Sequence, residues 1–230
     1  KGRKTKITKK IFFHGSYLGF FLFLAYYLAI VSLSYTTASK SGFLVALSVL
    51  WVPIAQLIIH RKRPNKWVVL CVSMSILGLY WISGLDGIGF NRGDAFAIGC
   101  SVAYTAYIML IDKYGKEMNE DQMTLVILLS VALISFFFAV VIEGLSFKLI
   151  VDNIIAIILI CLFGTIAATY FQTRAQQVAS PESVGIILLG EPLFTLVLAL
   201  IILGEKVTAL GLLGSALLLS SLLIAVIKKI

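Results

Sequence analysis

The feature that most constrains this chain is a series of apolar segments, each about as long as a helix that crosses a bilayer. We place eight of them, at about residues 11–34, 40–60, 67–84, 95–112, 122–142, 152–173, 182–203 and 207–227. Roughly 20 helical residues cross a hydrocarbon layer about 30 Å thick, and lipid satisfies no backbone group that lies outside a helix. The sequence therefore predicts an all-α integral membrane protein, a multi-pass helical bundle in which short loops join antiparallel helices.

Composition excludes a water-soluble globular domain. Only 13% of the 230 residues are charged and 60% are hydrophobic, whereas soluble domains carry about 25% charged residues. The three cysteines, Cys71, Cys100 and Cys161, lie inside apolar segments and have no metal-binding spacing. We therefore expect no disulfide framework, no metal site and no cofactor.

The distribution of positive charge predicts the orientation of the chain. Most of the 19 Lys and Arg residues fall on the side of the bilayer that carries the N-terminus, and the opposite side holds Lys40, Arg92, Lys148 and Lys206. Cytoplasmic loops carry such an excess, so both termini are expected in the cytoplasm and the protein in the cell (inner) membrane. The basic stretch at residues 1–10 adjoins the first segment, which favours an anchor on anionic lipid over a nucleic-acid-binding arm.

An internal repeat predicts how the segments are related. Ala38-Ser39 and a segment containing Pro53 are echoed by Ala179-Ser180 and a segment containing Pro192. The copies are offset by five segments, and an odd offset makes them upside down relative to each other, as in many secondary transporters.

The repeat also predicts the domain organisation. Residues 11–84 form a first copy of three spans and residues 93–228 a second copy of five. Because the first copy lacks partners for two spans of the second, we expect two further helices before Lys1.

Two segments carry signals for the start of a helix. Ser180-Pro181-Glu182 places a capping hydroxyl, a proline and an acid at the beginning of one segment, where each is favourable. Asp94, after Gly93, is expected to cap another segment in the same way.

Several short motifs in the second copy resemble the EamA family of the drug/metabolite transporter superfamily. They are Gly93-Asp94, Ala103-Tyr104-Thr105-Ala106-Tyr107, Gly164-Thr165-Ile166-Ala167-Ala168-Thr169-Tyr170 with Gln172 and Gln176, Ser180-Pro181, Gly190-Glu191-Pro192 and Leu203-Gly204-Glu205-Lys206. The resemblance implies a carrier or exporter of metabolites built from two inverted repeats of five helices, ten in all. It makes the two predicted domains an incomplete first and a complete second EamA repeat.

Glu191 is the residue most suggestive of a function. It lies about nine residues into its segment, roughly 14 Å deep at 1.5 Å per residue. An ionised carboxylate there costs about 2.5–3.5 kcal/mol or more, so it must face protein or water. Pro192 leaves the carbonyl of Leu188 without its donor and can kink the helix. Glu191 either contacts substrate or accepts a coupling proton, or it is a carboxyl that packs between helices.

Aromatic residues at depth complete the predicted site. Trp51 lies mid-span beside Pro53, and Tyr26 and Tyr104 lie well inside the hydrocarbon layer, whereas Trp67 reads as an interfacial residue. For each deep residue, helix packing is the alternative to substrate contact. The resemblance implies that the residues lining the cavity are Tyr26, Trp51, Tyr104, Tyr170, Gln172 and Glu191.

These observations favour a secondary transporter that moves a small metabolite or drug-like molecule by alternating access, as an exporter. A lipid-linked-sugar flippase of the same superfamily and a membrane subunit that does not transport are the alternatives. An intramembrane enzyme would need convergent catalytic groups, and the sequence has a single deep carboxylate, so we expect no enzyme activity. The expected partners are a small-molecule substrate and the lipid bilayer, with no nucleic acid.

Overall fold

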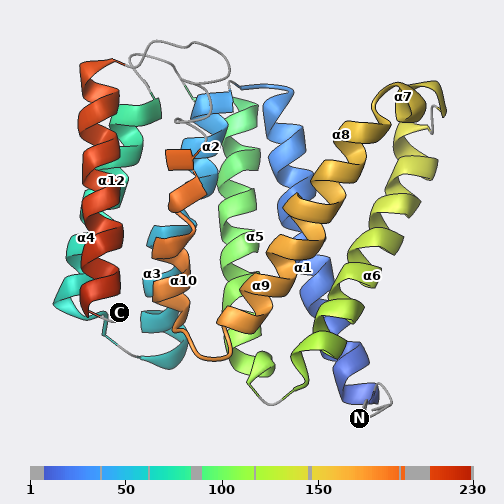
Figure 1. Ribbon diagram of the computed structural model, residues 1–230, viewed down its shortest axis with the longest axis horizontal. Helices are drawn as coiled ribbons and strands as arrows, with labels where there is room; N and C mark the ends of the chain where they lie inside the picture. The colour runs from blue at the N-terminus through green and yellow to red at the C-terminus, as the bar shows by residue number, and fades with distance from the viewer. Residues whose placement is uncertain are drawn as a thin grey trace. The chain divides into compact units, whose positions relative to one another are not determined.

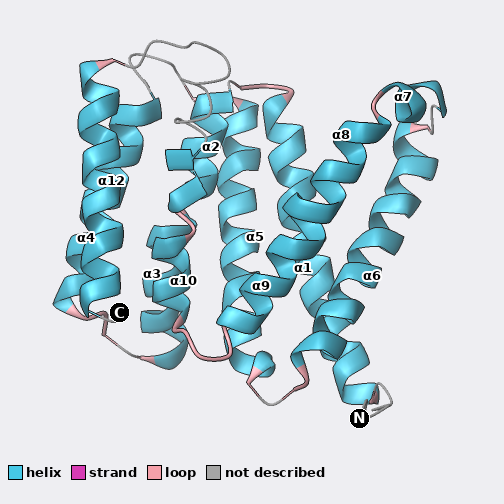
Figure 2. Cartoon of the chain, in the orientation of Figure 1, coloured by secondary structure: helices cyan, strands magenta, loops and turns pink. Residues whose placement is uncertain are grey.

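The computed structural model describes residues 8–36, 38–61, 63–83, 90–116, 118–144, 147–191, 193–194 and 208–228. Throughout these residues the regular structure is helical (Figures 1 and 2). The helices are α1 (Lys9–Leu33), α2 (Ala38–Ala46), α3 (Ser48–His60), α4 (Lys66–Ser83), α5 (Arg92–Gly115), α6 (Glu120–Phe138), η1 (Ala139–Glu143), α7 (Phe147–Asp152), α8 (Ile154–Leu159), η2 (Ile160–Ala167), α9 (Ala168–Ala175), α10 (Pro181–Ile187) and α12 (Ala209–Lys228). The predicted all-α fold is confirmed.

Among the described residues, six helical stretches are long and apolar enough to cross a membrane. They are Lys9–Leu33, Lys40–Ile59, Arg92–Gly115, Glu120–Ile142, Ile154–Ala175 and Ala209–Lys228. Lys66–Ile82 is a shorter apolar helix, and the segment predicted at 182–203 lies partly outside the described residues. The chain is therefore a multi-pass membrane protein, with six spans of full length in the described part instead of the eight predicted.

The chain divides into two compact units. Unit 1 comprises Lys1–Phe23 and Leu110–Ala179, and unit 2 comprises Leu24–Met109 and Ser180–Ile230. Each unit contains residues from both predicted repeats. The helices α1 and α5 are divided between the units, with one end of each in unit 1 and the other end in unit 2.

In unit 1 the start of α1 packs closely on α6. A Cβ atom on Gly15 would lie 2.7 Å from Cγ1 of Val126, and one on Gly19 would lie 2.8 Å from the carbonyl oxygen of Ile127. The hydroxyl of Ser130 donates a hydrogen bond to that of Ser16 over 3.3 Å. Small residues spaced four apart thus let the two backbones approach, as is common in membrane helices.

In unit 2 the closest helix pair is α4 and α12. A Cβ atom on Gly78 would lie 2.6 Å from the carbonyl oxygen of Gly214, and one on Gly214 would lie 2.5 Å from that of Gly78. The buried hydroxyls of Ser75 and Ser221 share a hydrogen bond of 2.9 Å. The hydrophobic core of this unit lies around the pair and includes Val49, Leu79, Ile186 and Leu218.

We predict that Gly78→Ala destabilises the protein, because the added methyl group meets backbone and the two helices must separate. The expected loss is about 1–3 kcal/mol in the free energy of unfolding, the usual cost of overpacking. Gly42→Ala is the matched control, since a Cβ atom on Gly42 has nothing within 4 Å. Unfolding in mixed micelles would measure both variants, and equal stabilities would contradict the prediction.

Candidate functional site

Two helical segments of unit 2 are interrupted before a proline in the sequence. The first changes from α2 to α3 at Leu47, whose carbonyl accepts from the N–H of Leu50 at 2.9 Å and from that of Trp51 at 3.2 Å. The second leaves α10 after Ile187 and makes a tight turn at residues 188–189. Both interruptions are closed by bonds to a residue only three positions away, which satisfies the backbone without water.

The second interruption leads directly to Glu191. The N–H of Glu191 donates to the carbonyl of Leu188 over 3.1 Å, so the prediction that this carbonyl is left without a donor is wrong. The interruption itself was predicted from Pro192, which lies outside the described residues. Glu191 is exposed.

The two interrupted segments pack against each other. A Cβ atom on Gly185 of α10 would make ordinary contacts of 3.7 Å with Cα of Val49 and Cγ2 of Val52 in α3. Val52 is the counterpart of Glu191 in the predicted repeat. This contact is one of several in unit 2 between the two predicted repeats, together with the packing of α4 on α12.

Two of the predicted site residues lie at one turn of α5. The indole N–H of Trp51 donates to the hydroxyl of Ser101 over 2.9 Å. Tyr104, which also belongs to α5, packs against the buried cluster of Ala25, Cys100 and Ala103. This turn is near the middle of the 24-residue α5, so it lies at the depth where transporter sites occur.

The remaining predicted residues have other surroundings. Tyr26 is half-buried in the part of α1 that belongs to unit 2. Tyr170 and Gln172 lie in unit 1, where the Tyr170 hydroxyl accepts from Arg174 at 3.2 Å and the Gln172 amide donates to Gln176 at 3.4 Å. The π-helical η2 directly precedes these last two residues, and π-helical turns are frequent at functional sites.

A hollow on the surface of unit 1 lies beside these residues without including them. It has a volume of about 460 Å³ and is lined by Glu120, Phe171, Arg174, Ala175, Gln177 and Val178. The guanidinium Nε of Arg174 is 3.8 Å from Oε1 of Glu120. Within the described residues, no group of three or more His, Cys, Asp or Glu side chains could hold a metal ion.

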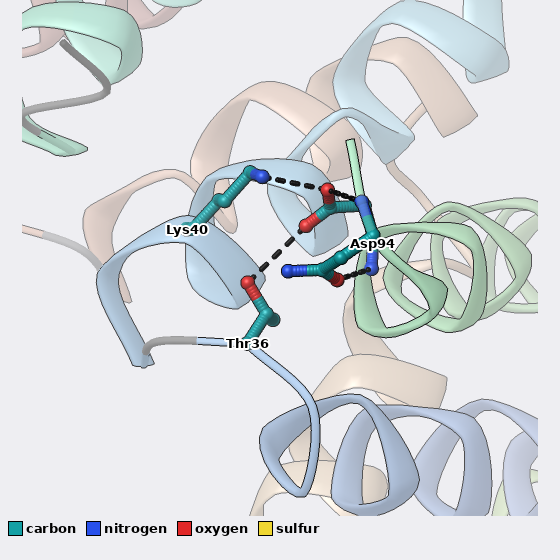
Figure 3. A network of polar contacts seen from close by, with 4 residues as sticks. Thr36, Lys40 and Asp94 are labelled. Carbon is teal, nitrogen blue, oxygen red and sulfur yellow. Dashed lines mark hydrogen bonds and ion pairs between the residues drawn. The ribbon is translucent and has the colours of Figure 1, made fainter. Parts of the chain in front are cut away.

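A buried ion pair in unit 2 joins Lys40 to Asp94 (Figure 3). The Lys40 Nζ is 2.6 Å from Oδ2 of Asp94, and the two side chains are 8% and 0% exposed. The hydroxyl of Thr36 donates to Oδ1 of Asp94 over 3.2 Å. The pair therefore joins the start of α2 to the start of α5 and to the chain segment after α1.

Asp94 also closes the first turn of α5. The N–H of Asn91 donates to Oδ2 of Asp94 at 2.7 Å, and the N–H of Asp94 donates to Oδ1 of Asn91 at 3.0 Å. This reciprocal pair is a capping box, in which Asn91 is the cap and Asp94 lies in the first turn of α5, whereas Asp94 itself was predicted to be the cap. Gly93 is required beside it, because a Cβ atom there would lie 2.8 Å from the carbonyl oxygen of Ser32.

Two polar residues of unit 2 were missed by the sequence analysis. Lys40 was counted as a loop cation and is in fact buried in a helix. Glu182 was read only as an acid at a helix start, a place where Ser180 provides the predicted cap by accepting from the N–H of Ser183 at 3.2 Å. Glu182 is 6% exposed, and its Oε2 has no hydrogen-bond partner among the described residues. Its place at a helix start offered no sequence signal for this burial.

Comparisons with known proteins agree with this arrangement. The model of the EamA-like transporter family matches residues 1–84 and 91–227. The chain belongs to the EamA-like transporter family. An uncharacterized transporter from Archaeoglobus fulgidus is 26% identical over 214 residues, which are 93% of this chain and 68% of the relative. One crystal structure of a protein shares the fold with a TM-score of 0.75 at 13% identity, over 95% of this chain and 85% of that chain.

We predict that Lys40→Met and Asp94→Asn each destabilise the protein by about 3–5 kcal/mol, because each leaves one buried charge without its partner. The double variant should be more stable than the two losses together predict, and a double-mutant cycle on unfolding would measure that coupling. Lys116→Met is the control: Lys116 pairs with Asp112 over the same 2.6 Å but is 51% exposed, where ion pairs contribute about 0–1 kcal/mol. A Lys40→Met loss no larger than that of Lys116→Met would contradict the prediction.

Proposed function

We propose that this protein is a secondary transporter that exports a small metabolite or drug-like molecule across the cell membrane by alternating access. The observation that carries the proposal is the bond of Trp51 to the middle turn of α5, which also carries Tyr104, in the unit where two helical segments are interrupted, one of them directly before Glu191. Interrupted helices at mid-membrane depth commonly border the substrate site of a transporter.

The exposure of Glu191 supports a role in that site. A carboxylate exposed to lipid at this depth costs several kcal/mol, so an exposed Glu191 has to face a water-filled path. A carboxyl that only packed between helices would be buried and hydrogen-bonded. Glu191 therefore contacts a polar or cationic group of the substrate, or carries a coupling proton, from the wall of the transport path.

The neighbouring side chains suit an amphipathic substrate. The indole of Trp51 has a single N–H, and it donates to Ser101. This bond fixes the indole and leaves its apolar faces for contact. The Tyr104 ring stacks on Tyr107 with a centroid distance of 5.8 Å. Rigid aromatic surfaces beside one carboxylate are the usual composition of a small-molecule site. Tyr26 is proposed as a further lining residue in unit 2, and Tyr170 and Gln172 as lining residues in unit 1.

The inverted-repeat organisation is part of the proposal, with residues 11–84 as an incomplete first repeat and residues 93–228 as a complete second one. Two observations support it. The family description matches the chain in two separate stretches, 1–84 and 91–227, and each repeat has a helix interrupted a few residues before its proline. Alternating access then consists of the two repeats rocking around their shared site, with both termini in the cytoplasm.

We predict that Glu191→Gln lowers transport at least tenfold and removes its dependence on a pH gradient. Purified full-length protein in liposomes would be tested with a panel of amino acids, amphipathic cations and nucleotide sugars. Asp121→Asn, which removes an exposed acid at the start of α6, is the control and should transport normally. Normal flux and pH dependence in Glu191→Gln would remove the role proposed for this residue. If the protein moved a lipid-linked sugar and none of these soluble compounds, the proposed function would be a flippase and no longer an exporter.

We also predict that cysteines at positions 63 and 92 are labelled from opposite sides of the membrane. Arg63 and Arg92 are both exposed, and the inverted repeat places one on each side. Cys161, which is exposed, would first be replaced by Ala to keep the background low. Labelling of Arg63→Cys and Arg92→Cys with an impermeant thiol reagent on intact cells should modify only the second. Labelling of both from one side would contradict the orientation.

A further inference from the structure

A cluster of positive charge surrounds Trp67 at one end of unit 2. In Figure 1 the red α12 stands beside the teal α4, and α12 ends where α4 begins. The ammonium of Lys228, at the end of α12, is 4.5 Å from the centroid of the Trp67 ring. The ammonium of Lys66, at the start of α4, is 5.7 Å from the same ring. Two cations from two helices thus lie over one indole. We call the group of Lys66, Trp67 and Lys228 the Trp67 corner.

Among the described residues, neither cation forms an ion pair with an acidic side chain. Neither Asp nor Glu occurs in residues 61–83 or in residues 208–230. Arg61 and Arg63 are exposed in the connection that leads into α4, so the surroundings of the Trp67 corner are positive as well.

The backbone holds one of these arginines in an uncommon conformation. Arg61 ends α3 with φ of 53° and ψ of 22°, and its N–H donates to the carbonyl of Gln56. Among the described residues, it is the only one other than glycine with a positive φ. This conformation ends α3 and begins the short connection that carries Arg61 and Arg63 toward the Trp67 corner.

We propose that the Trp67 corner binds the headgroup phosphate of an anionic phospholipid. Both ammonium groups lie within about 6 Å of one ring, and a phosphate at this end of the helix pair would accept charge-assisted hydrogen bonds from them. A tryptophan at the end of a membrane helix sits at the level of the lipid headgroups. The phosphate most available at that level belongs to lipid, and basic sites between membrane helices bind anionic headgroups.

Binding would also bear on the stability of the bundle. The α4 and α12 helices that carry the corner are the pair held at Gly78 and Gly214. An anion that neutralises Lys66 and Lys228 together clamps the ends of these two helices. Anionic lipid should then stabilise unit 2 through this pair, whatever molecule the protein transports.

The test uses the full chain in lipid nanodiscs and competes phosphatidylglycerol against phosphatidylcholine. Native mass spectrometry would count the lipid that is retained, and thermal unfolding would report stabilisation. We expect wild type to prefer phosphatidylglycerol and the Lys66→Gln/Lys228→Gln variant to lose about tenfold or more of that preference, since each basic residue near the surface contributes about fivefold in affinity.

Two matched variants keep this test specific. Lys113→Gln/Lys116→Gln removes two positive charges elsewhere in the chain. Lys113 also lies over an aromatic ring, with its ammonium 5.1 Å from the centroid of Tyr114. This variant should keep the preference for phosphatidylglycerol. Lys66→Arg/Lys228→Arg retains the charge and should keep it as well. Equal losses in both glutamine variants would overturn the proposal, because they would show general attraction to an anionic surface.

The source of the phosphate is tested separately. Inorganic phosphate and soluble glycerophosphoglycerol would be added in detergent without anionic lipid. Stabilisation of wild type by either of them equal to that by phosphatidylglycerol would overturn the assignment to a lipid. If the glutamine variant does not fold, an absent preference for phosphatidylglycerol in wild type would still overturn the proposal, and a preference kept in the arginine variant would support it.

Discussion

The absence of hydrogen-bonding solvent in the hydrocarbon layer is the constraint on which the rest of this structure depends. It requires each backbone group to find a partner within the chain, and continuous helices meet that requirement over most of the described residues. The two interrupted segments meet it with short-range bonds at Leu47 and Leu188. These tight turns permit a change of direction at depth without an unpaired group, and one of them leads directly to the exposed carboxylate of Glu191.

Close packing and buried charge then hold the interrupted segments in place. Lipid is as apolar as leucine, so helices associate through shape and polar contacts more than through the hydrophobic effect. Gly78 and Gly214 give α4 and α12 a contact between backbones. The ion pair of Lys40 and Asp94 fastens the start of α2, and hence the first interrupted segment, to α5. The α5 helix in turn carries Tyr104 and the turn to which Trp51 is bonded.

Much of the fold was predictable, because it follows from the length and polarity of local segments. The helices and the cap at Ser180 are properties of short stretches of chain, and the structure has the cap and helices over most of the predicted segments that it describes. The pairing of Lys40 was not predictable in the same way. A lysine near a segment end reads as a loop cation, and only the packing of α2 against the start of α5 buries it. Glu182 was misread for the same reason, since its sequence position indicates a helix start and its burial comes from other helices.

The sequence by itself determined that this protein crosses a membrane as a set of helices, because the bilayer selects for length and polarity that can be counted along the chain. It also placed an acidic residue, Glu191, beside a proline in an apolar segment. Which side chains share the surroundings of the predicted site was decided by the tertiary structure. Trp51, Tyr104 and Glu191 come from three separate segments, and the rotation of each helix about its axis depends on contacts such as Trp51 with Ser101. A helix that is apolar around nearly its whole circumference carries no sequence signal for its rotation, so only packing against other helices sets that rotation.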